Sequence, residues 1–310
     1  METDRLSEII KQKAEELGFD ECGITPVIDL SGDIERLRKW ISNKYHAGME
    51  WIERSIPLRE NPGLLLPGVK SVVVFALNYN SSDVIFASDY KISKYALNRD
   101  YHVVIKSKLY RLLSFIQEMD PVIEGRVFVD SGPVFEKLYA VNAGLGWIGK
   151  NSCLILPKRG SFFFLGTMLL NVSLTPDNSY TLNHCGKCTR CIDACPTGAL
   201  TVPYTIDSNK CISYLTIEHK GEIPQNIDFK SGKQIFGCDI CQQVCPFNKF
   251  SLNTREEDFL PTKQLISMTS QDWETLTKSD FKKKFKQTPL YRSGYEKIKS
   301  TIAYINKDGD

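Results

Sequence analysis

Eight of the ten cysteines in this chain of 310 residues form a pattern that constrains its fold more strongly than any other feature. One run has the spacing Cys-x2-Cys-x2-Cys-x3-Cys-Pro, a second has Cys-x2-Cys-x3-Cys-Pro, and one further cysteine lies between them. In order, they are Cys185, Cys188, Cys191, Cys195, Cys211, Cys238, Cys241 and Cys245. The first spacing is the one with which bacterial ferredoxins bind a 4Fe–4S cluster. The chain must therefore fold so that thiolates from three segments converge.

The number of cysteines matches two clusters, because each 4Fe–4S cluster takes four thiolates. In two-cluster ferredoxins the last cysteine of each run binds the other cluster. The second run lacks its first cysteine, and Cys211 is the thiolate that can replace it. The predicted ligand sets are Cys185, Cys188, Cys191 and Cys245 for one cluster, and Cys195, Cys211, Cys238 and Cys241 for the other.

Other uses of these cysteines explain the pattern less well. A zinc ribbon takes two Cys-x2-Cys pairs and leaves both x3-Cys-Pro endings unexplained. Disulfides need an oxidising compartment, which nothing else in the chain suggests. The two remaining cysteines, Cys22 and Cys153, are interpreted as buried small hydrophobic residues rather than reactive thiols.

Composition and charge indicate a globular cytoplasmic protein. The chain is 42% hydrophobic and long enough for two domains, and its formal net charge of +2 creates no global field for a polyanion. The first twenty residues read as a charged amphipathic helix without the apolar core of a signal peptide. The longest strongly apolar stretch, 162–170, is far shorter than the ~18 residues of a membrane span.

The order of the predicted elements indicates an α+β fold in three parts. Residues 1–175 form a mixed α/β domain, with helices expected at 1–18, 102–119 and 135–144 and strands at 71–79, 125–130, 151–157 and 161–174. Residues 176–250, rich in Cys, Pro and small polar residues, form a ferredoxin-like 4Fe–4S domain. Residues 251–310 form a short helical C-terminal segment, in which Ser270 is the expected N-cap of one helix.

The C-terminal segment is locally basic. Between residues 278 and 299 eight Lys or Arg residues stand against two acidic ones. Such a run indicates either a solvated helix face or a surface that contacts phosphates.

Three motifs in the first domain bear on function. Gly144-x-Gly146-x-x-Gly149 matches a dinucleotide-binding fingerprint, but a helix precedes it and a strand follows it, so an NAD site is not expected. Asp130, in FVDSGP at the end of a strand, either projects into a ligand crevice or caps the turn after it. Asp100-Tyr101-His102 precedes a helix, where Asp100 is either an N-cap or part of a site.

Two classes of function are compatible with these features. Two clusters alone make an electron carrier. The 175 residues in front of them are more than a carrier needs, and they favour an enzyme whose clusters reduce a redox centre in the first domain.

The chain closely resembles the epoxyqueuosine reductase family, cobalamin-dependent iron–sulfur enzymes of queuosine biosynthesis. The Cys runs occur in many proteins, but their coupling to VDSGP, CISYLTIE and GCDICQQVCP is more specific. The matching stretches are RENPGLLLPG (59–68), RDYH (99–102), VDSGP (129–133), AGLGWIGKNS (143–152), HCGKCTRCIDACPTGAL (184–200), CISYLTIEHKG (211–221) and FGCDICQQVCPFN (236–248).

The resemblance implies reduction of the epoxide of epoxyqueuosine to the cyclopentene of queuosine, at the wobble base of tRNAs with GUN anticodons (those for Asp, Asn, His and Tyr). Cobalamin would bind to the first domain, and a flavodoxin or ferredoxin system would supply electrons through the two clusters. Asp130 matches the family's proton donor, and this role requires a raised pKa in a desolvated pocket. Because the sequence after Asp100-Tyr101-His102 lacks the glycine of the DxHxxG motif, no histidine ligand to cobalt is expected.

Further positions carry over from the resemblance. The expected cobalamin-binding residues are Arg59, Ser93, Asp130, Leu154, Leu165, Ser213 and Asp239. The segment expected to approach the tRNA nucleotide is Thr216, Ile217, Glu218 and His219. Longer family members continue into helical repeats that hold tRNA, and the basic stretch 278–299 is a candidate replacement. We expect a monomer. The alternative function is a ferredoxin-type carrier or a cobalamin-dependent reductase of a small molecule.

Overall fold

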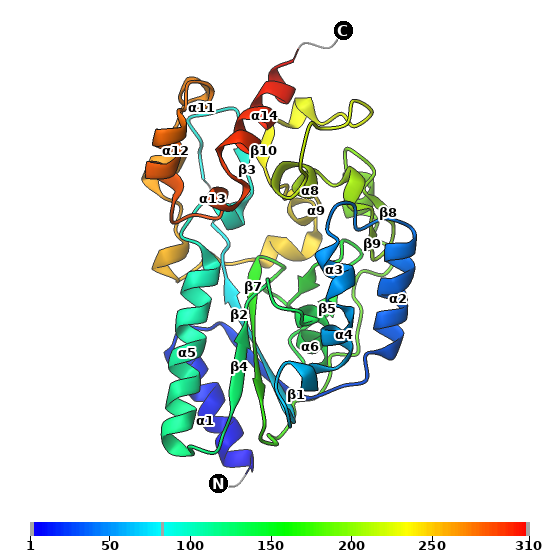
Figure 1. Ribbon diagram of the computed structural model, residues 1–310, viewed down its shortest axis with the longest axis vertical. Helices are drawn as coiled ribbons and strands as arrows, with labels where there is room; N and C mark the ends of the chain where they lie inside the picture. Colours follow the sequence, from blue (N-terminus) through cyan, green and yellow to red (C-terminus); the bar gives the residue numbers. More distant parts are fainter. Residues whose placement is uncertain (1–2, 82–83, 308–310) are drawn as a thin grey trace.

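The computed structural model describes residues 3–81 and 84–307, and its centre is one antiparallel sheet (Figure 1). The strand order is β1-β2-β7-β4, with bounds Glu21–Pro26, Ser71–Asn78, Phe163–Leu170 and Gly125–Phe128 respectively. All eight residues of β2 are buried, because helices cover both faces of the sheet. This burial explains why SVVVFALN is almost continuously apolar.

Alternate residues of the strands serve two different cores. On one side Val73, Phe75 and Met168 pack against α1 (Thr3–Glu16) and α5 (Tyr101–Met119). On the other side Val74 and Leu169 pack against α2 (Ser31–Ser42), α6 (Glu136–Asn142) and the short helix α4 (Ile56–Glu60). The period of two residues in β-strands produces this division. The short helix α3 (Trp51–Arg54) and the 3-10 turns η1 (Pro62–Leu64) and η2 (Lys94–Ala96) complete this part.

The predicted helices at 102–119 and 135–144 are confirmed as α5 and α6, and the strand prediction at 151–157 is only partly correct. The strand there, β6, is Leu154–Ile155, and it pairs with β5 (Trp147–Ile148) in a separate hairpin. The backbone of Gly146 approaches the hairpin so closely that a Cβ would lie 2.1 Å from the carbonyl oxygen of Ile155. Gly146 and Gly149 therefore serve close packing of the hairpin, and Gly144 close packing against Asn178, rather than a dinucleotide.

The cysteine-rich part consists of short helices and turns. Its elements are α7 (Arg190–Asp193), β8 (Leu200–Val202), β9 (Thr205–Ile206), η3 (Ser208–Lys210), α8 (Ile212–Ile217), η4 (Lys230–Gly232), β10 (Gln234–Phe236), α9 (Ile240–Gln243) and η5 (Pro246–Phe250). Strand β10 pairs in parallel with β3 (Lys91–Ile92). This pairing ties the second cysteine run to the segment that precedes α5.

The predicted helical C-terminal segment is confirmed. It contains η6 (Glu257–Phe259), α10 (Lys263–Ile266), α11 (Ser270–Glu274), α12 (Lys278–Phe285), α13 (Leu290–Ser293) and α14 (Tyr295–Asn306). The N-cap of α11 is Thr269 and not Ser270, because Thr269 forms a capping box with Asp272. These helices share a hydrophobic core with Ile92 and Phe236, so the domain limits at 175/176 and 250/251 stay a prediction.

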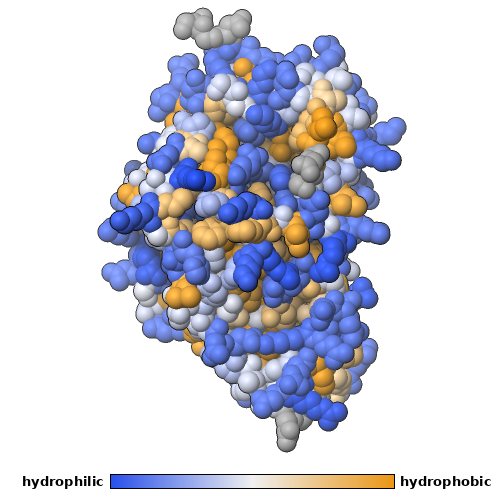
Figure 2. All heavy atoms as spheres, turned by 180° about the vertical axis from the view of Figure 1, so that it is seen from behind, coloured by the Kyte–Doolittle hydropathy of each residue, from blue (hydrophilic) through white to orange (hydrophobic). Residues whose placement is uncertain are grey.

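The surface mixes hydrophilic and hydrophobic side chains. Figure 2 shows bands of hydrophobic atoms between hydrophilic ones across the middle of the rear face. In the described part of the chain, no helix combines the length and the apolar character that crossing a bilayer requires. Residues 1–2 of the predicted first helix and 308–310 of the C-terminal segment lie outside the described residues.

Candidate active site

The predicted ligands of the first cluster lie together. Cys185, Cys188, Cys191 and Cys245 line one small cavity, with Pro246 and Phe247 beside them. The Lys150 ammonium donates hydrogen bonds to the carbonyls of Gly186 (2.7 Å) and Cys188 (2.9 Å). These bonds fix the loop that carries the first cysteines of the set.

The predicted ligands of the second cluster form another group. Burial, together with the nearby thiols of Cys211 and Cys195, raises the pKa of Cys238 to about 12. Burial also raises the pKa of Cys211, whereas N–H groups at the start of α8 donate to its sulfur and oppose that effect. Cys241 adjoins Cys238 and Cys211. Amide donors of this kind also stabilise the negative charge of a thiolate-bound cluster.

The arrangement of these thiols bears on the choice between clusters, zinc and disulfides, which rests on their spacing in the sequence. All ten cysteines are free. Among the described residues, no three His, Cys, Asp or Glu side chains converge on a point suited to a single metal ion. Four thiolates around one zinc ion lie within roughly 4 Å of each other. A cubane holds its thiolates further apart, because four irons lie between them.

A ninth thiol lies beside the second group and was missed by sequence reasoning. Cys153, from the β5–β6 hairpin, forms a thiol–thiol hydrogen bond with Cys241, which lowers the pKa of Cys153 to about 7 and raises that of Cys241. Only the fold brings the hairpin to Cys241, so the sequence could not show this contact, and the interpretation of Cys153 as an unreactive residue stays a prediction. Cys22 packs against the core on the α1–α5 side, and burial raises its pKa to about 12.

Two predicted cofactor residues, Ser93 and Asp239, contact each other. The Asp239 carboxylate accepts a 2.7 Å hydrogen bond from the Lys94 N–H and another from the Ser93 hydroxyl. Burial raises the pKa of Asp239, and these bonds lower it in part. Gly237 has a φ of +69°, and a Cβ there would lie 2.3 Å from Ser93 Oγ. Only glycine therefore allows this approach.

The motifs around Asp100 and Asp130 meet in space. Asp130 follows β4 with a φ of +55°, a left-handed conformation that is uncommon for a residue with a side chain. Its carboxylate accepts a hydrogen bond from the Tyr101 hydroxyl and lies 3.6 Å from His102 Nε2. His102 Nδ1 lies 2.8 Å from Asp100, which also caps α5 as predicted. Two hydrogen-bonded pairs, Asp100–His102 and Tyr101–Asp130, therefore lie side by side, and His102 Nε2 faces the Asp130 carboxylate.

The pKa of Asp130 differs from the expectation drawn from the sequence. Burial favours the protonated form of Asp130, but contacts with His102 and Tyr101 outweigh it and lower the pKa. The predicted raised pKa is therefore wrong, because the sequence did not show that both side chains reach the carboxylate. Burial opposes the charged form of His102, but Asp100 and Asp130 together raise its pKa to about 9. At neutral pH the proton lies on His102.

A second carboxyl near Asp130 was also missed. Glu136 accepts a 3.1 Å hydrogen bond from the Asp130 N–H. Burial, and to a smaller extent the charge of Asp130, raises the pKa of Glu136 to about 8. Arg59 lies nearby and donates to the Val134 carbonyl at 3.1 Å. The only sign of Glu136 in the sequence was its place at the start of a predicted helix, shortly after VDSGP.

The remaining predicted cofactor residues lie in two parts of the fold. Leu154 and Leu165 belong to the same apolar cluster, on the α6 side of the sheet, together with Phe128. Ser213 lies in the first turn of α8, where its N–H donates to the Cys211 sulfur.

The segment predicted to approach RNA is only partly accessible. Thr216 is fully buried, and its hydroxyl bonds to the Ile212 carbonyl and the Gly237 N–H, so its side chain is not available to RNA. Ile217 packs against the C-terminal core. Glu218 pairs with Arg292 at 3.3 Å, and His219 bonds to the Glu222 carbonyl.

The basic stretch 278–299 is not one continuous surface. Lys297 is only 8% exposed, and its burial lowers its pKa to about 8. Lys278 pairs with Glu296 at 3.5 Å. The exposed lysines of α12, such as Lys282 and Lys283, are what remains for contacts with phosphates.

The chain is similar to epoxyqueuosine reductases along nearly its whole length. Residues 59–131 match the family described as epoxyqueuosine reductase QueG, DUF1730, and residues 184–248 match the 4Fe-4S double cluster binding domain. The epoxyqueuosine reductase of Cellulophaga algicola is 45% identical over 302 residues, which cover 97% of this chain and 98% of the relative. That of Escherichia coli is 43% identical over 271 residues, or 86% of this chain and 71% of the relative.

Solved structures agree with this similarity. A crystal structure of epoxyqueuosine reductase with a tRNA-Tyr epoxyqueuosine-modified stem loop has a TM-score of 0.88 and 30% identity, and the match covers 97% of this chain and 82% of that one. The structure of the Streptococcus thermophilus epoxyqueuosine reductase has a TM-score of 0.85 and 28% identity, with coverages of 95% and 79%.

Proposed function

The chain belongs to the epoxyqueuosine reductase family, and we propose that it reduces epoxyqueuosine to queuosine in tRNA by means of cobalamin and two 4Fe–4S clusters. The observation that carries the proposal is the position of Asp130. Its carboxylate, which is bonded to Tyr101 and lies beside His102, is connected through the segment that holds Ser93 to the loop of the second cysteine group. The modified stem loop bound to a similar enzyme supports tRNA as the substrate.

The reaction requires two electrons and two protons. Both C–O bonds of the epoxide break, a carbon–carbon double bond forms, and the oxygen leaves as water. The opening of the first C–O bond puts negative charge on the oxygen, and a proton delivered there accelerates such a step by a factor of ~10²–10⁴.

The residues around Asp130 supply that proton. The ionised Asp130 carboxylate is held by Tyr101 and lies beside the protonated His102 imidazolium. His102 is the proton reservoir, and Asp130 passes the proton to the epoxide oxygen. Asp100 keeps His102 charged and oriented through its 2.8 Å contact. Glu136 holds the backbone of Asp130 in its left-handed conformation.

The side chains predicted to bind the cofactor are both polar and apolar, which fits an organic cofactor with polar edges. Arg59, Ser93, Ser213 and Asp239 would hold the polar groups of cobalamin, and Leu154 and Leu165 would form an apolar wall against its ring. Cobalamin, when bound there, supplies strongly reducing cobalt. The second cysteine group, which contains Cys211 next to Ser213, would pass electrons to it, and the first group would receive them from outside.

Anaerobic reconstitution with iron, sulfide and cobalamin, followed by reaction with an epoxyqueuosine-containing anticodon stem loop and dithionite, tests the proposal. Mass spectrometry of the nucleosides should show the loss of one oxygen. Asp130→Asn should keep iron and cobalamin but lose turnover by at least ~10²-fold. An unchanged nucleoside with fully loaded wild-type enzyme would contradict the proposed substrate, and undiminished turnover in the variant would contradict the role of Asp130.

A further inference from the structure

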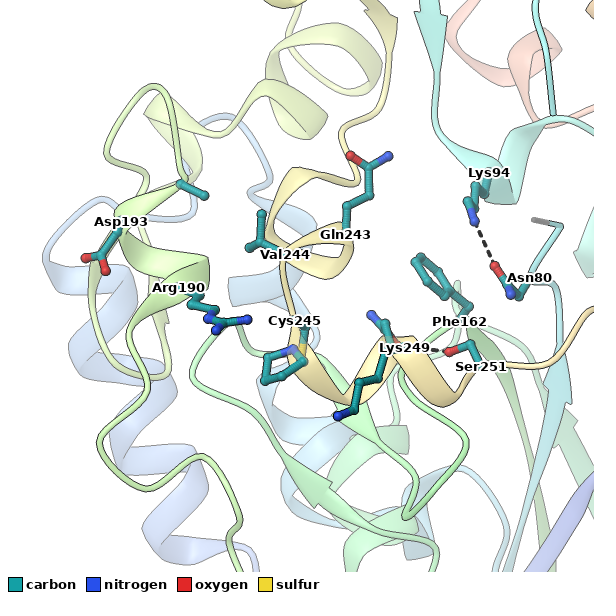
Figure 3. Close-up of a pocket in the computed structure, with 13 residues that line it drawn as sticks. Asn80, Lys94, Phe162, Arg190, Asp193, Gln243, Val244, Cys245, Lys249 and Ser251 are labelled. Atoms are coloured by element: carbon teal, nitrogen blue, oxygen red, sulfur yellow. Dashed lines mark hydrogen bonds between the residues drawn. The ribbon is translucent and has the colours of Figure 1, made fainter. Parts of the chain in front are cut away.

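A wide groove lies on the outer side of the first cysteine group. It has a volume of about 1110 Å³ and is open to solvent. Figure 3 shows Arg190 and Asp193 on one side, Asn80, Lys94 and Phe162 on the other, and Cys245 and Lys249 between them. We call it the Cys245 groove. A pocket for a small molecule usually has ~300–1,000 Å³ and encloses most of its ligand. This groove is larger and more open, so it suits the surface of a macromolecule.

The Cys245 groove adjoins the cavity of the first cluster. Arg190, Cys245 and Pro246 line both the groove and the small cavity that holds Cys185, Cys188 and Cys191. The groove therefore lies directly beside the cluster ligands, one of which, Cys245, lines it. An electron that enters from this groove reaches the first cluster without crossing the rest of the protein.

The charge of the groove is positive, although the whole chain is almost neutral. Lys94, Arg190 and Lys249 line it against one acid, Asp193, which accepts a 2.7 Å hydrogen bond from Thr189. Within residues 3–81 and 84–307, Arg190 and Lys249 form no salt bridge. Both side chains are exposed, so their charge faces an incoming partner.

An apolar edge continues the groove at its end. Phe250 is 48% exposed and Leu252 is 74% exposed, directly after Lys249 in the chain. The Lys249 ammonium lies 4.7 Å from the centre of the Phe250 ring. Apolar contacts beside a ring of charge are typical of weak redox complexes, which bury less than ~1,200 Å².

We propose that the Cys245 groove is the docking site of a small acidic electron-carrier protein of the ferredoxin type. The carrier gives up one electron per encounter to the cluster at Cys185, Cys188, Cys191 and Cys245 and is itself oxidised. Two encounters supply the two electrons that one epoxide consumes. The use of these electrons rests on the proposed function, but the docking itself can be measured without RNA.

The test is the rate at which a reduced acidic ferredoxin reduces the clusters of the reconstituted enzyme, followed by visible absorbance in a stopped-flow instrument. Reversal of both charges, Arg190→Glu with Lys249→Glu, should lower the second-order rate constant at least ~10-fold at low salt. The difference should shrink as salt rises, because salt screens steering. Dithionite, which needs no docking site, should reduce wild type and variant equally.

A matched control carries the same change of charge elsewhere. Lys39 on α2 and Arg111 on α5 are exposed and line neither cavity, so Lys39→Glu with Arg111→Glu should leave the rate unchanged. If the charge-reversed groove variant loses iron, the pair Arg190→Gln with Lys249→Gln decides the question, with a smaller decrease expected.

Two outcomes would overturn the proposal. One is an unchanged rate in the groove variant, and the other is an equal decrease in the control pair. If the rate is unchanged and the variant also binds the stem loop more weakly in a gel shift, the groove is assigned to RNA instead. Failure of wild-type enzyme to convert epoxyqueuosine with dithionite would instead refute the proposed function and leave the docking result intact.

Discussion

The contact between Asp100 and His102 predicts how turnover depends on pH. The two carboxylates around His102 hold its pKa at about 9, against an ordinary value of ~6.5. This difference corresponds to about 3 kcal/mol in favour of the charged imidazolium, whose side chain is only 18% exposed. Since the folded pKa is raised, this stabilisation is complete below pH ~6.5 and is lost as the pH rises through about 9.

Asp100→Asn should shift this behaviour without unfolding α5. Asp100 lies at 2.8 Å from His102 and Asp130 at 3.6 Å, so Asp100 contributes the larger share. Its removal should lower the pKa of His102 by at least about one unit, or ~1.4 kcal/mol. Asparagine caps helices about as well as aspartate, so the N-cap bond to the His102 N–H is kept.

The assay is the single-turnover reduction of the stem loop by pre-reduced enzyme at a series of pH values. Turnover of wild type should fall with a midpoint near pH 9, and that of Asp100→Asn should fall at least about one pH unit lower. Iron content and the cobalamin spectrum must be the same in both proteins. Equal midpoints in two equally loaded enzymes would refute His102 as the proton reservoir.

Three further predictions follow from the same site. Cys241→Ser should lose one cluster, about four irons per chain, whereas its neighbour Cys153→Ser should keep it, as measured by iron and sulfide analysis. The pKa of Glu136 is raised to about 8, so ionising its buried carboxyl lowers the stability of the wild type as the pH rises towards 8. The melting temperature of the wild type should therefore fall between pH 5 and 8.5, and Glu136→Gln should make this fall smaller. Arg59→Met should weaken cobalamin binding roughly tenfold in an absorbance titration, the effect of one charged hydrogen bond of about 1.5 kcal/mol.

The sequence was most informative where spacing alone determines chemistry. The rule that the last cysteine of each run binds the other cluster placed Cys245 with the first run, and the cavity that Cys245 shares with Cys185, Cys188 and Cys191 matches that assignment. The cap at Asp100 was also predictable, because the first turn of a helix requires an acceptor there.

Contacts between distant segments were not predictable from one sequence. Nothing in the order of residues shows that Tyr101 and His102 reach Asp130 across two different elements, so the direction of its pKa was predicted wrongly. Cys153 reaches Cys241 only because a short hairpin folds back on the second cysteine run. Lys297 looked like part of a basic surface, but α14 turns it into the protein.

One short segment connects the electron pathway to the proton-donating group. Residues 91–92 form β3, which pairs with β10, and β10 leads directly into Cys238. The next residues bond to Asp239 inside the second cysteine run, and the chain then continues to Asp100 and the start of α5. The cysteine loop cannot move away from the Asp130 group without breaking the bonds of Asp239 to this segment, which are buried. Electrons and protons that must meet at one epoxide therefore arrive from groups held at a fixed separation, which is the condition under which positioning lowers a reaction barrier.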